Sequence, residues 1–254
     1  MPVDNLLGSM FFVSHSLMCE WDERLSVIEA LMLETTNENS PPTNSHADIL
    51  SAAARCFKEN GFSATSIDDV AHSLGATKGR IYHHFRSKTD LFFAVYRRGM
   101  EINFQATLPQ SKYEGDTLTR LARMGLTHAV TMMAYQDFQR VLLQGVTMHQ
   151  TGSTTAAQRV TLDELIEIRN QYEALFRTAI EAVAKEQKLV LTNPSVVSKS
   201  FLAVLNSSVF WYTPRVENDK QEQINLAREL VTFALNGFGA TLSADADLFL
   251  GELK

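Results

Sequence analysis

The sequence of 254 residues has few of the features that mark secreted or membrane proteins. It holds two cysteines, Cys19 and Cys56, which are too few for a disulfide or zinc framework and favour a reducing compartment. No apolar run approaches the roughly 18 residues that a membrane span needs. The first apolar stretch follows no Lys or Arg, as a secretory signal would require. We therefore expect a cytoplasmic protein that does not bind membranes.

Proline and glycine are also scarce, with six and twelve residues, and this leaves long uninterrupted segments. Apolar residues recur in these segments at the spacing of amphipathic helices. No segment alternates between polar and apolar residues as a half-buried strand would, and no internal repeat is present. The sequence therefore predicts an all-α fold.

Positive charge is missing from most of the chain. The net charge is −6, and residues 1–45 carry one Arg against seven acidic residues. Residues 46–100 instead carry eight Lys or Arg against five acidic residues, and residues 101–254 are again net negative. A local basic surface can attract a phosphate backbone even on an acidic protein, because charges beyond about 8 Å are screened.

Composition and turn-forming residues divide the chain into four parts, which are residues 1–45, 46–106, 107–241 and 242–254. The first part is an acidic extension in which residues 16–35 have the pattern of an amphipathic helix. This extension is a loosely packed addition, an over-extended translation start, or an arm that docks on a partner subunit. The second part predicts four helices, and the third predicts a larger helical region.

Breaker residues predict where individual helices end. Gly61 ends the first helix of residues 46–106, and the fourth runs to about residue 106. In the larger region we expect connections at residues 108–116, 150–155, 191–195 and 213–219. Pro194 suits the first turn of a helix after Asn193, and Gly237 suits the stop of a last helix over residues 219–236.

The four helices predicted within residues 46–106 differ in the charge of their first turns. Three start with a serine three residues before an aspartate, as in a capping box, namely Ser45 with Asp48, Ser66 with Asp69, and Ser87 with Asp90. The remaining helix follows Thr77 and carries Lys78 and Arg80 but no acid in its first turn. Cations oppose the helix dipole there unless an external anion is present. This helix start therefore predicts an anion-binding end.

The segment LGAT, residues 74–77, joins two short helices and predicts a helix-turn-helix. The second helix of that motif enters the major groove of DNA, where its side chains contact phosphates and base edges. The candidate contacts are Thr77, Lys78, Gly79, Arg80, Tyr82, His83 and, in the next helix, Lys88. His83 and His84 do not predict a metal pair, because adjacent helical residues point about 100° apart.

Residues 61–96, GFSATSIDDVAHSLGATKGRIYHHFRSKTDLFFAVY, resemble the DNA-binding domain of TetR/AcrR-family transcriptional regulators. The fixed spacing of Gly61, Gly75, Gly79, Tyr82 and Phe85 carries much of the likeness. The resemblance implies a homodimeric repressor with a helix-turn-helix domain over residues 46–106 and a ligand-binding and dimerisation domain over residues 107–241. A small-molecule effector would release it from a palindromic operator of double-stranded DNA.

The resemblance also implies roles for particular residues. DNA contacts carry over to Thr65 or Ser66, Thr77, Lys78, Arg80, Tyr82, His83 and Lys88, and core positions carry over to Ile67, Ile81 and Phe85. SVFWYTP, residues 208–214, with the helix after it, looks like the last two helices of the family, which form an intersubunit four-helix bundle. Its W-Y-x-P ending is similar to that of members that sense acyl-CoA thioesters or govern fatty-acid or aromatic-acid breakdown.

The larger helical region offers candidates for an effector pocket, since methionine clusters suit adaptable binding sites. The expected lining residues are His128, Met133, Phe138, Arg140, His149, Arg169 and Tyr172, whose polar members would orient an anionic effector. The alternative for each of them is an ordinary core residue or a surface residue.

An enzyme is the contrasting hypothesis. The sequence contains no HExxH, GxSxG or Walker loop and no Cys/His spacing typical of a metal site. We therefore expect no catalytic activity, no cofactor and no bound metal. The alternative is an all-α enzyme, or a ligand-binding protein with a role that does not involve DNA.

Overall fold

The computed structural model describes residues 46–151, 155–214 and 220–242. All regular structure in these ranges is helical, so the prediction of an all-α fold is confirmed. The amphipathic helix predicted over residues 16–35 and the predicted tail from residue 243 onward lie outside the described residues.

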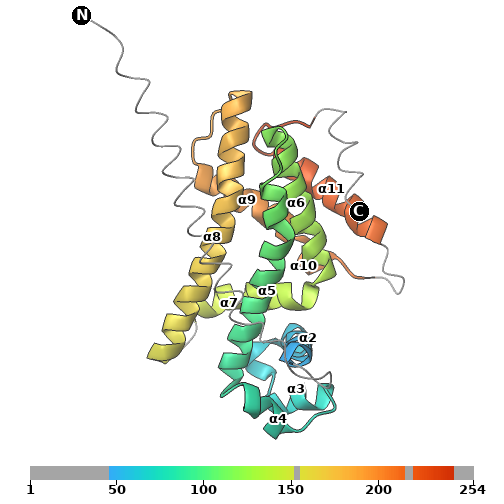
Figure 1. The fold of residues 1–254 in the computed structure, drawn as a ribbon, viewed down its shortest axis with the longest axis vertical. Helices are drawn as coiled ribbons and strands as arrows, with labels where there is room; N and C mark the ends of the chain where they lie inside the picture. The colour runs from blue at the N-terminus through green and yellow to red at the C-terminus, as the bar shows by residue number, and fades with distance from the viewer. Residues whose placement is uncertain (1–45, 152–154, 215–219, 243–254) are drawn as a thin grey trace, which may run out of the picture. The chain divides into compact units, whose positions relative to one another are not determined.

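The described helices follow one another with short connections (Figure 1). They are α2 (His46–Ala64), α3 (Ile67–Ser73), α4 (Lys78–His84), α5 (Lys88–Ser111), α6 (Thr117–Ala134), α7 (Gln136–Thr151), α8 (Ala156–Gln187), α9 (Pro194–Asn206), α10 (Ser208–Trp211) and α11 (Lys220–Asn236). We call α2–α4 the N-terminal helix group and α5–α11 the body helices. None of the described helices is long and apolar enough to cross a bilayer.

The N-terminal helix group is held by an aromatic and aliphatic core. The rings of Phe57 and Phe62 meet the ring of Phe92 on α5 edge to face, at centroid distances of 5.3 and 5.0 Å. Ile81 of α4 is fully buried, and Phe85 is nearly so. Ile67 is also buried, so all three core positions implied by the family resemblance are buried.

The turns of this group follow the sequence closely. At Gly61 the backbone leaves helical geometry with φ 76° and ψ 165°, which agrees with the predicted stop. Gly75, between α3 and α4, has φ 63°, a conformation that favours glycine over residues with a Cβ. Its N–H donates to the carbonyl of His72 at 3.0 Å and closes the turn.

Two of the three predicted serine caps are present. The Ser66 Oγ accepts from the backbone N–H of Asp69 at 3.2 Å, and the Asp69 carboxylate accepts from the N–H of Ser66 at 2.7 Å, which completes a capping box. The Ser87 Oγ accepts from the N–H of Asp90 at 3.1 Å. Ser45 lies outside the described residues.

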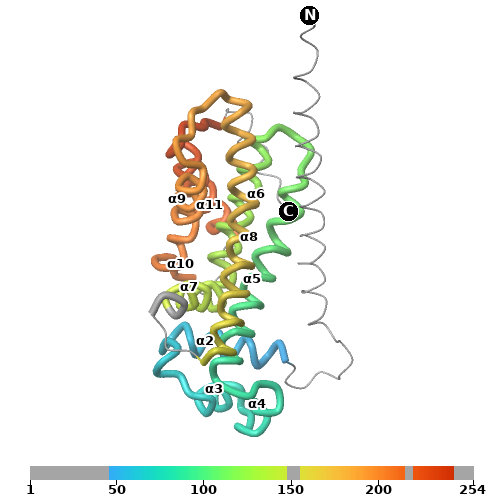
Figure 2. Tube along the Cα trace, turned by 90° about the vertical axis from the view of Figure 1, so that its left-hand side faces the viewer, coloured from blue at the N-terminus to red at the C-terminus, as the bar shows by residue number. Residues whose placement is uncertain are grey.

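Helix α5 connects the N-terminal helix group to the rest of the protein. Figures 1 and 2 both show α3 and α4 near the first turns of α5, which then leads away from them alongside α6 and α8. It ends at Ser111 rather than near residue 106, because Pro109 in its last turns does not interrupt it. A break after α6, at Tyr135, separates α6 from α7, and no breaker residue in the sequence predicts it.

The C-terminal helices confirm the predicted caps. The Asn193 side chain accepts from the N–H groups of Ser195 and Val196 at the start of α9, where Pro194 is the first residue. Helix α11 ends at Asn236, directly before Gly237. The first four residues of the SVFWYTP segment form the short α10, and α10 and α11 are the last two described helices.

Candidate functional site

Helix α4 presents an exposed polar face. Thr77, Lys78, Gly79, Tyr82 and His83 are exposed, whereas Arg80 is half-buried. On the opposite side, the buried Ile81 fixes the helix against its neighbours. The residues predicted to contact DNA on this helix therefore share one accessible surface, apart from partial burial of Arg80.

The start of α4 differs from the starts of α3 and α5 in the structure as well as in the sequence. Thr77 occupies the N-cap position, but its side chain makes no cap hydrogen bond. The first turn contains no acid. The Lys78 ammonium pairs with the exposed Asp68 carboxylate at 2.8 Å, which raises the pKa of Lys78. Because both groups are solvated, this pair is worth little and a phosphate can replace it.

Thr65 does not lie on this surface. It is 1% exposed, and its hydroxyl lies 2.7 Å from the carbonyl of Gly61 and 3.0 Å from that of Cys56. The hydroxyl thus donates to carbonyls at the end of α2, and the Gly61 carbonyl also accepts from the Thr65 N–H at 3.2 Å. The expectation of a DNA contact fits Ser66, which is exposed, and not Thr65.

Lys88 also has a different environment from the one expected. Its ammonium donates to the carbonyls of Phe62 and Ser63 at 2.8 and 3.2 Å and lies 4.6 Å from the centre of the Phe62 ring. In this structure Lys88 therefore holds the connection between α2 and α3 through two of its three ammonium protons.

The two histidines of α4, His83 and His84, are both exposed. The His84 ring meets those of His83 and His46 edge to face, at 5.2 and 5.9 Å. Partial burial and the neighbouring His83 and Arg80 lower the pKa of His84. In the part of the chain that the structure describes, no group of three or more His, Cys, Asp or Glu side chains is placed to hold a metal ion.

The body helices form a cavity of about 360 Å³ that is partly open to solvent. Helices α5 to α10 contribute its wall, which is formed by Met100, Asn103, His128, Met132, Gln139, Leu142, Leu143, Val146, Arg169, Tyr172, Glu173, Lys199, Leu202, Ala203, Asn206, Val209 and Phe210. Such mixtures of apolar residues with a few polar groups are typical of small-molecule sites.

The wall contains three of the seven expected pocket residues, namely His128, Arg169 and Tyr172. Met133 is an ordinary core residue, and Phe138 does not reach the cavity. The Arg140 guanidinium donates to the carbonyl of Phe210 at 3.4 Å and lies over its ring, outside the wall. The His149 side chain falls outside the described part of the structure.

A chain of buried hydrogen bonds crosses the cavity wall. The Tyr172 hydroxyl lies 2.8 Å from the Thr107 hydroxyl and 2.8 Å from His128 Nδ1, and His128 Nε2 lies 2.9 Å from Asn206 Oδ1. With Nε2–H donating to Asn206, Nδ1 accepts from Tyr172. Burial lowers the pKa of His128 to about 4 and raises the pKa of Tyr172. Both side chains are therefore neutral near pH 7.

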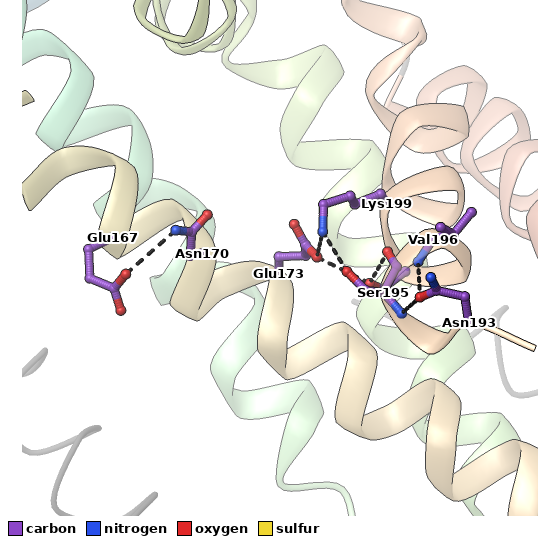
Figure 3. A network of polar contacts seen from close by, with 8 residues as sticks. Glu167, Asn170, Glu173, Asn193, Ser195, Val196 and Lys199 are labelled. Atoms are coloured by element: carbon purple, nitrogen blue, oxygen red, sulfur yellow. Dashed lines mark hydrogen bonds and ion pairs between the residues drawn. The ribbon is translucent and has the colours of Figure 1, made fainter. Parts of the chain in front are cut away.

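Two further polar groups of the wall are paired with each other. Asn103 and Gln139 exchange amide hydrogen bonds of 3.2 and 2.9 Å between α5 and α7. On the other side, the buried Glu173 carboxylate accepts from the Lys199 ammonium at 2.9 Å, and Lys199 also donates to the Ser195 hydroxyl at 2.6 Å (Figure 3). These contacts join α8 to α9.

Sequence reasoning missed most of the wall, including Met100, Asn103, Gln139, Lys199 and Asn206. The residues on α5, α6 and α7 recur at three- or four-residue spacing, which marks the inner face of each helix. That spacing does not distinguish a core position from a cavity position. Whether such a position lies in the core or lines the cavity depends on how several helices pack together.

Helix α7 touches both the cavity and the N-terminal helix group. Leu143 lines the cavity, and the next residue, Gln144, donates to the carbonyl of Phe57 at 2.9 Å and accepts from the N–H of Phe62 at 3.2 Å. At the start of α7, Asp137 pairs with Lys58 of α2 at 2.7 Å. A change in the position of α7 would therefore alter the contacts of α2 and of the turn that leads into α3.

Comparison with known proteins gives two family matches. Residues 49–95 match the family described as bacterial regulatory proteins of the tetR family, and residues 114–238 match the tetracyclin repressor-like C-terminal domain. Together these matches span more than half of the chain. They fall on the N-terminal helix group with the start of α5, and on the body helices that form the cavity.

Individual relatives agree with these matches. The HTH-type transcriptional regulator AcrR of Shigella flexneri is 25% identical over 213 residues, which cover 80% of this chain and 93% of the relative. The HTH-type transcriptional repressor KstR2 of Mycolicibacterium smegmatis is 32% identical over 106 residues, 39% of this chain and 51% of the relative.

Solved structures have the same fold. The TetR-family regulator PfmR of Thermus thermophilus superposes with a TM-score of 0.63 at 22% identity, over 80% of this chain and all of that one. AibR in complex with isovaleryl coenzyme A and operator DNA superposes with a TM-score of 0.56 at 22% identity, over 73% of this chain and 96% of that one. With a basic helix-turn-helix surface followed by a helical body that matches the family's second domain, this chain belongs to the TetR family of transcriptional regulators.

Proposed function

We propose that this protein is a repressor that binds a palindromic operator as a homodimer in the cytoplasm and leaves it when a small molecule occupies the cavity. The single observation that carries the proposal is the exposed start of α4, which has Lys78 and Arg80 but no acid, on the same chain as the cavity. Helices α5 and α7 line the cavity and pack against α2, so occupancy of the cavity can influence the N-terminal helix group.

The DNA contacts we propose are the exposed and half-buried residues of α4 and its approach, namely Ser66, Thr77, Lys78, Gly79, Arg80, Tyr82 and His83. Arg80 and Lys78 suit guanine edges and phosphates, and Tyr82 suits a phosphate or a thymine methyl group. Gly79 carries no side chain that would keep the α4 backbone away from the groove. Thr77, whose hydroxyl does not cap the helix, keeps that hydroxyl free to donate to a phosphate.

The homodimer is supported by apolar side chains on the last helices. Phe210 and Trp211 on α10 are 62% and 51% exposed, and Phe233 on α11 is 70% exposed. Exposed aromatic residues of this size are typical of interfaces. A second copy that covers them would set the separation of the two α4 helices, which must match major grooves about 34–36 Å apart.

The contacts of α7 suggest how an effector would release the protein from its operator. An effector that presses on Leu142, Leu143 or Val146 displaces α7, and Gln144 then pulls on the backbone of Phe57 and Phe62. The two α4 helices of the dimer would no longer match adjacent grooves. For this to work, the effector must bind the displaced state more tightly than the DNA-bound state.

For the effector we propose an acyl-CoA thioester, or a fatty or aromatic acid. The WYTP segment supports this class through its likeness to regulators of acid breakdown, and AibR, a structural relative, has been crystallised with isovaleryl coenzyme A and operator DNA.

The proposed function is tested by titrating the protein with duplex DNA from the region upstream of its own gene. The parent protein should bind with an affinity that falls as salt rises, and Arg80→Ala should weaken binding by about 1–3 kcal/mol. Arg177→Ala, on α8 and away from α4, is the matched control and should bind as the parent does. Unchanged affinity in Arg80→Ala together with salt-independent binding by the parent would refute the proposal.

A further inference from the structure

The charges of the cavity wall do not balance. Three charged side chains line it, Arg169, Glu173 and Lys199. Glu173 and Lys199 neutralise each other through an ion pair of 2.9 Å. Arg169 belongs to none of the ion pairs found among the described residues. The wall therefore carries one net positive charge, which belongs to a half-buried guanidinium.

The neutral polar groups of the wall offer little to a ligand. His128 uses both ring nitrogens on Tyr172 and Asn206, and Asn103 and Gln139 hold each other. A ligand group that competed for these atoms would have to break a buried hydrogen bond. The remainder of the wall is aliphatic, methionine or aromatic side chains. The cavity thus suits an apolar body, with one place for a charged end.

A second side chain near Arg169 lacks a partner. Tyr96 on α5 is fully buried, and its hydroxyl has no hydrogen-bond partner among the described residues. It lies one helical turn before the wall residue Met100 and is not itself among the residues that line the cavity. Burial raises the pKa of the Tyr96 hydroxyl to about 12, and the charge of Arg169 acts in the opposite direction. A buried hydroxyl without a partner is costly unless a ligand or water satisfies it.

The size of the cavity limits the ligand. At about 30 Å³ for each water-sized atom, 360 Å³ holds on the order of a dozen non-hydrogen atoms. This is enough for a medium-chain fatty acid or a small aryl-alkanoic acid. A coenzyme A group is several times larger, so a thioester would have to leave its nucleotide portion outside.

From these observations we infer that the effector is a free carboxylic acid with a compact apolar body, whose carboxylate binds Arg169. The inference rests on the proposed function, since it names the class of molecule that occupies the effector site. A planar guanidinium accepts a carboxylate through two parallel hydrogen bonds, which makes Arg169 selective for acids over their amides.

The test compares matched acids and amides by calorimetry on the full chain. The probes are decanoate, decanamide, 4-phenylbutyrate and 4-phenylbutyramide, with decanoyl-CoA as the thioester. The parent should bind at least one acid about tenfold or more tightly than its amide, and decanoyl-CoA no more tightly than decanoate. Arg169→Gln should abolish the preference for acid. Arg177→Gln, which leaves the cavity wall intact, should keep the full preference.

Equal affinity for acid and amide, binding of neither acid, or an unchanged preference in Arg169→Gln would overturn the inference. Duplex binding by the same variants, measured without probe, separates this result from the proposed function. Arg169→Gln should bind DNA as the parent does, because Arg169 lies in the body helices. A parent that fails to bind DNA refutes the repressor function, whatever the acids do.

Discussion

The N-terminal helix group and the cavity are built in opposite ways. On α4, the side chains proposed to bind DNA are largely exposed and belong to a segment of seven residues, with neighbours in the sequence fixing their directions. In the cavity, most of the polar side chains are buried, and they come from helices that are far apart in the sequence. Thr107 and Tyr172, which share a hydrogen bond of 2.8 Å, are separated by 65 residues.

This difference has energetic consequences. A substitution on an exposed surface changes what the surface binds but changes stability little. A substitution in a buried polar chain leaves its partners unsatisfied and costs stability directly. We therefore expect α4 to tolerate changes in its outer residues, and the cavity to couple ligand binding to the stability of the whole body.

The largest effect is expected where the two regions join. Phe57→Ala removes a fully buried ring that packs on Phe92 of α5, and it should lower the free energy of unfolding by about 3–5 kcal/mol. Because α5 and α7 pack on α2, the body should unfold together with the N-terminal helix group. Urea denaturation followed by the fluorescence of Trp211, in a Trp21→Phe background, reports on the body alone.

The control for that experiment is Val190→Ala, since Val190 is 94% exposed and should change stability by less than about 0.5 kcal/mol. A shift of the Trp211 transition in Phe57→Ala would establish that the two regions unfold as one. An unchanged Trp211 midpoint would mean that they unfold independently, and the comparison would then be between two separate folding units.

The next largest effect concerns pH and the cavity. The pKa of His128 is about 4 in the folded protein, and 6.5 is its ordinary value. Between these two values the unfolded chain binds a proton that the folded protein does not, so stability falls as pH drops from about 6.5 to 4. The loss should be on the order of 3 kcal/mol.

His128→Gln is the variant that isolates this contribution, because glutamine hydrogen bonds but does not titrate. We expect its stability at pH 7 to be lower than that of the parent, and the gap to narrow as the pH falls to 4. The other histidines and the nearby Glu173, Arg169 and Lys199 are the same in both proteins and cancel in the difference. Parallel stability curves for the two proteins would show that His128 is not the group responsible.

The same contrast between local and long-range contacts explains how well the sequence predicts each region. The capping box at Ser66, the turn at Gly75 and the buried Ile81 depend on neighbours within a few residues, and all three are found where the sequence predicts them. The family resemblance implies DNA contacts for Thr65 and Lys88. In the structure, however, their side chains donate hydrogen bonds to backbone carbonyls of the chain itself. A sequence motif predicts where a residue lies in the fold, but it does not predict which group the side chain of that residue contacts.

The sequence predicts the cavity poorly for a different reason. Tyr172 and His128 can be expected because polar residues on an apolar helix face are conspicuous, whereas nothing in the sequence marks the helix of Lys199 as part of the pocket. Arg140 has the same side chain as Arg169, and nothing in the sequence around the two residues shows which of them lines the cavity. Whether an arginine reaches a cavity or covers a neighbouring ring depends on how α7, α8 and α10 pack.

A smaller effect is expected at the contact that links the two regions. Gln144→Ala leaves the carbonyl of Phe57 and the N–H of Phe62 without their side-chain partner, which should cost about 1–3 kcal/mol. Hydrogen exchange at the Phe62 amide should accelerate by a matching factor. Gln105→Ala, an exposed glutamine on α5, serves as the control and should leave that rate unchanged. No acceleration in Gln144→Ala would mean that α7 does not hold the turn into α3.

The smallest effect compares two N-cap residues that differ in what their hydroxyls do. Ser66 caps α3 through a complete capping box, so Ser66→Ala should lower stability by about 1 kcal/mol. Thr77 makes no cap bond to α4, so Thr77→Ala should change stability by less than about 0.5 kcal/mol and instead weaken binding to duplex DNA. Thermal unfolding and duplex titration of both variants measure the two quantities. A loss of stability in Thr77→Ala as large as that in Ser66→Ala would mean that Thr77 caps its helix in solution, and the start of α4 would then lose the feature that sets it apart from its neighbours.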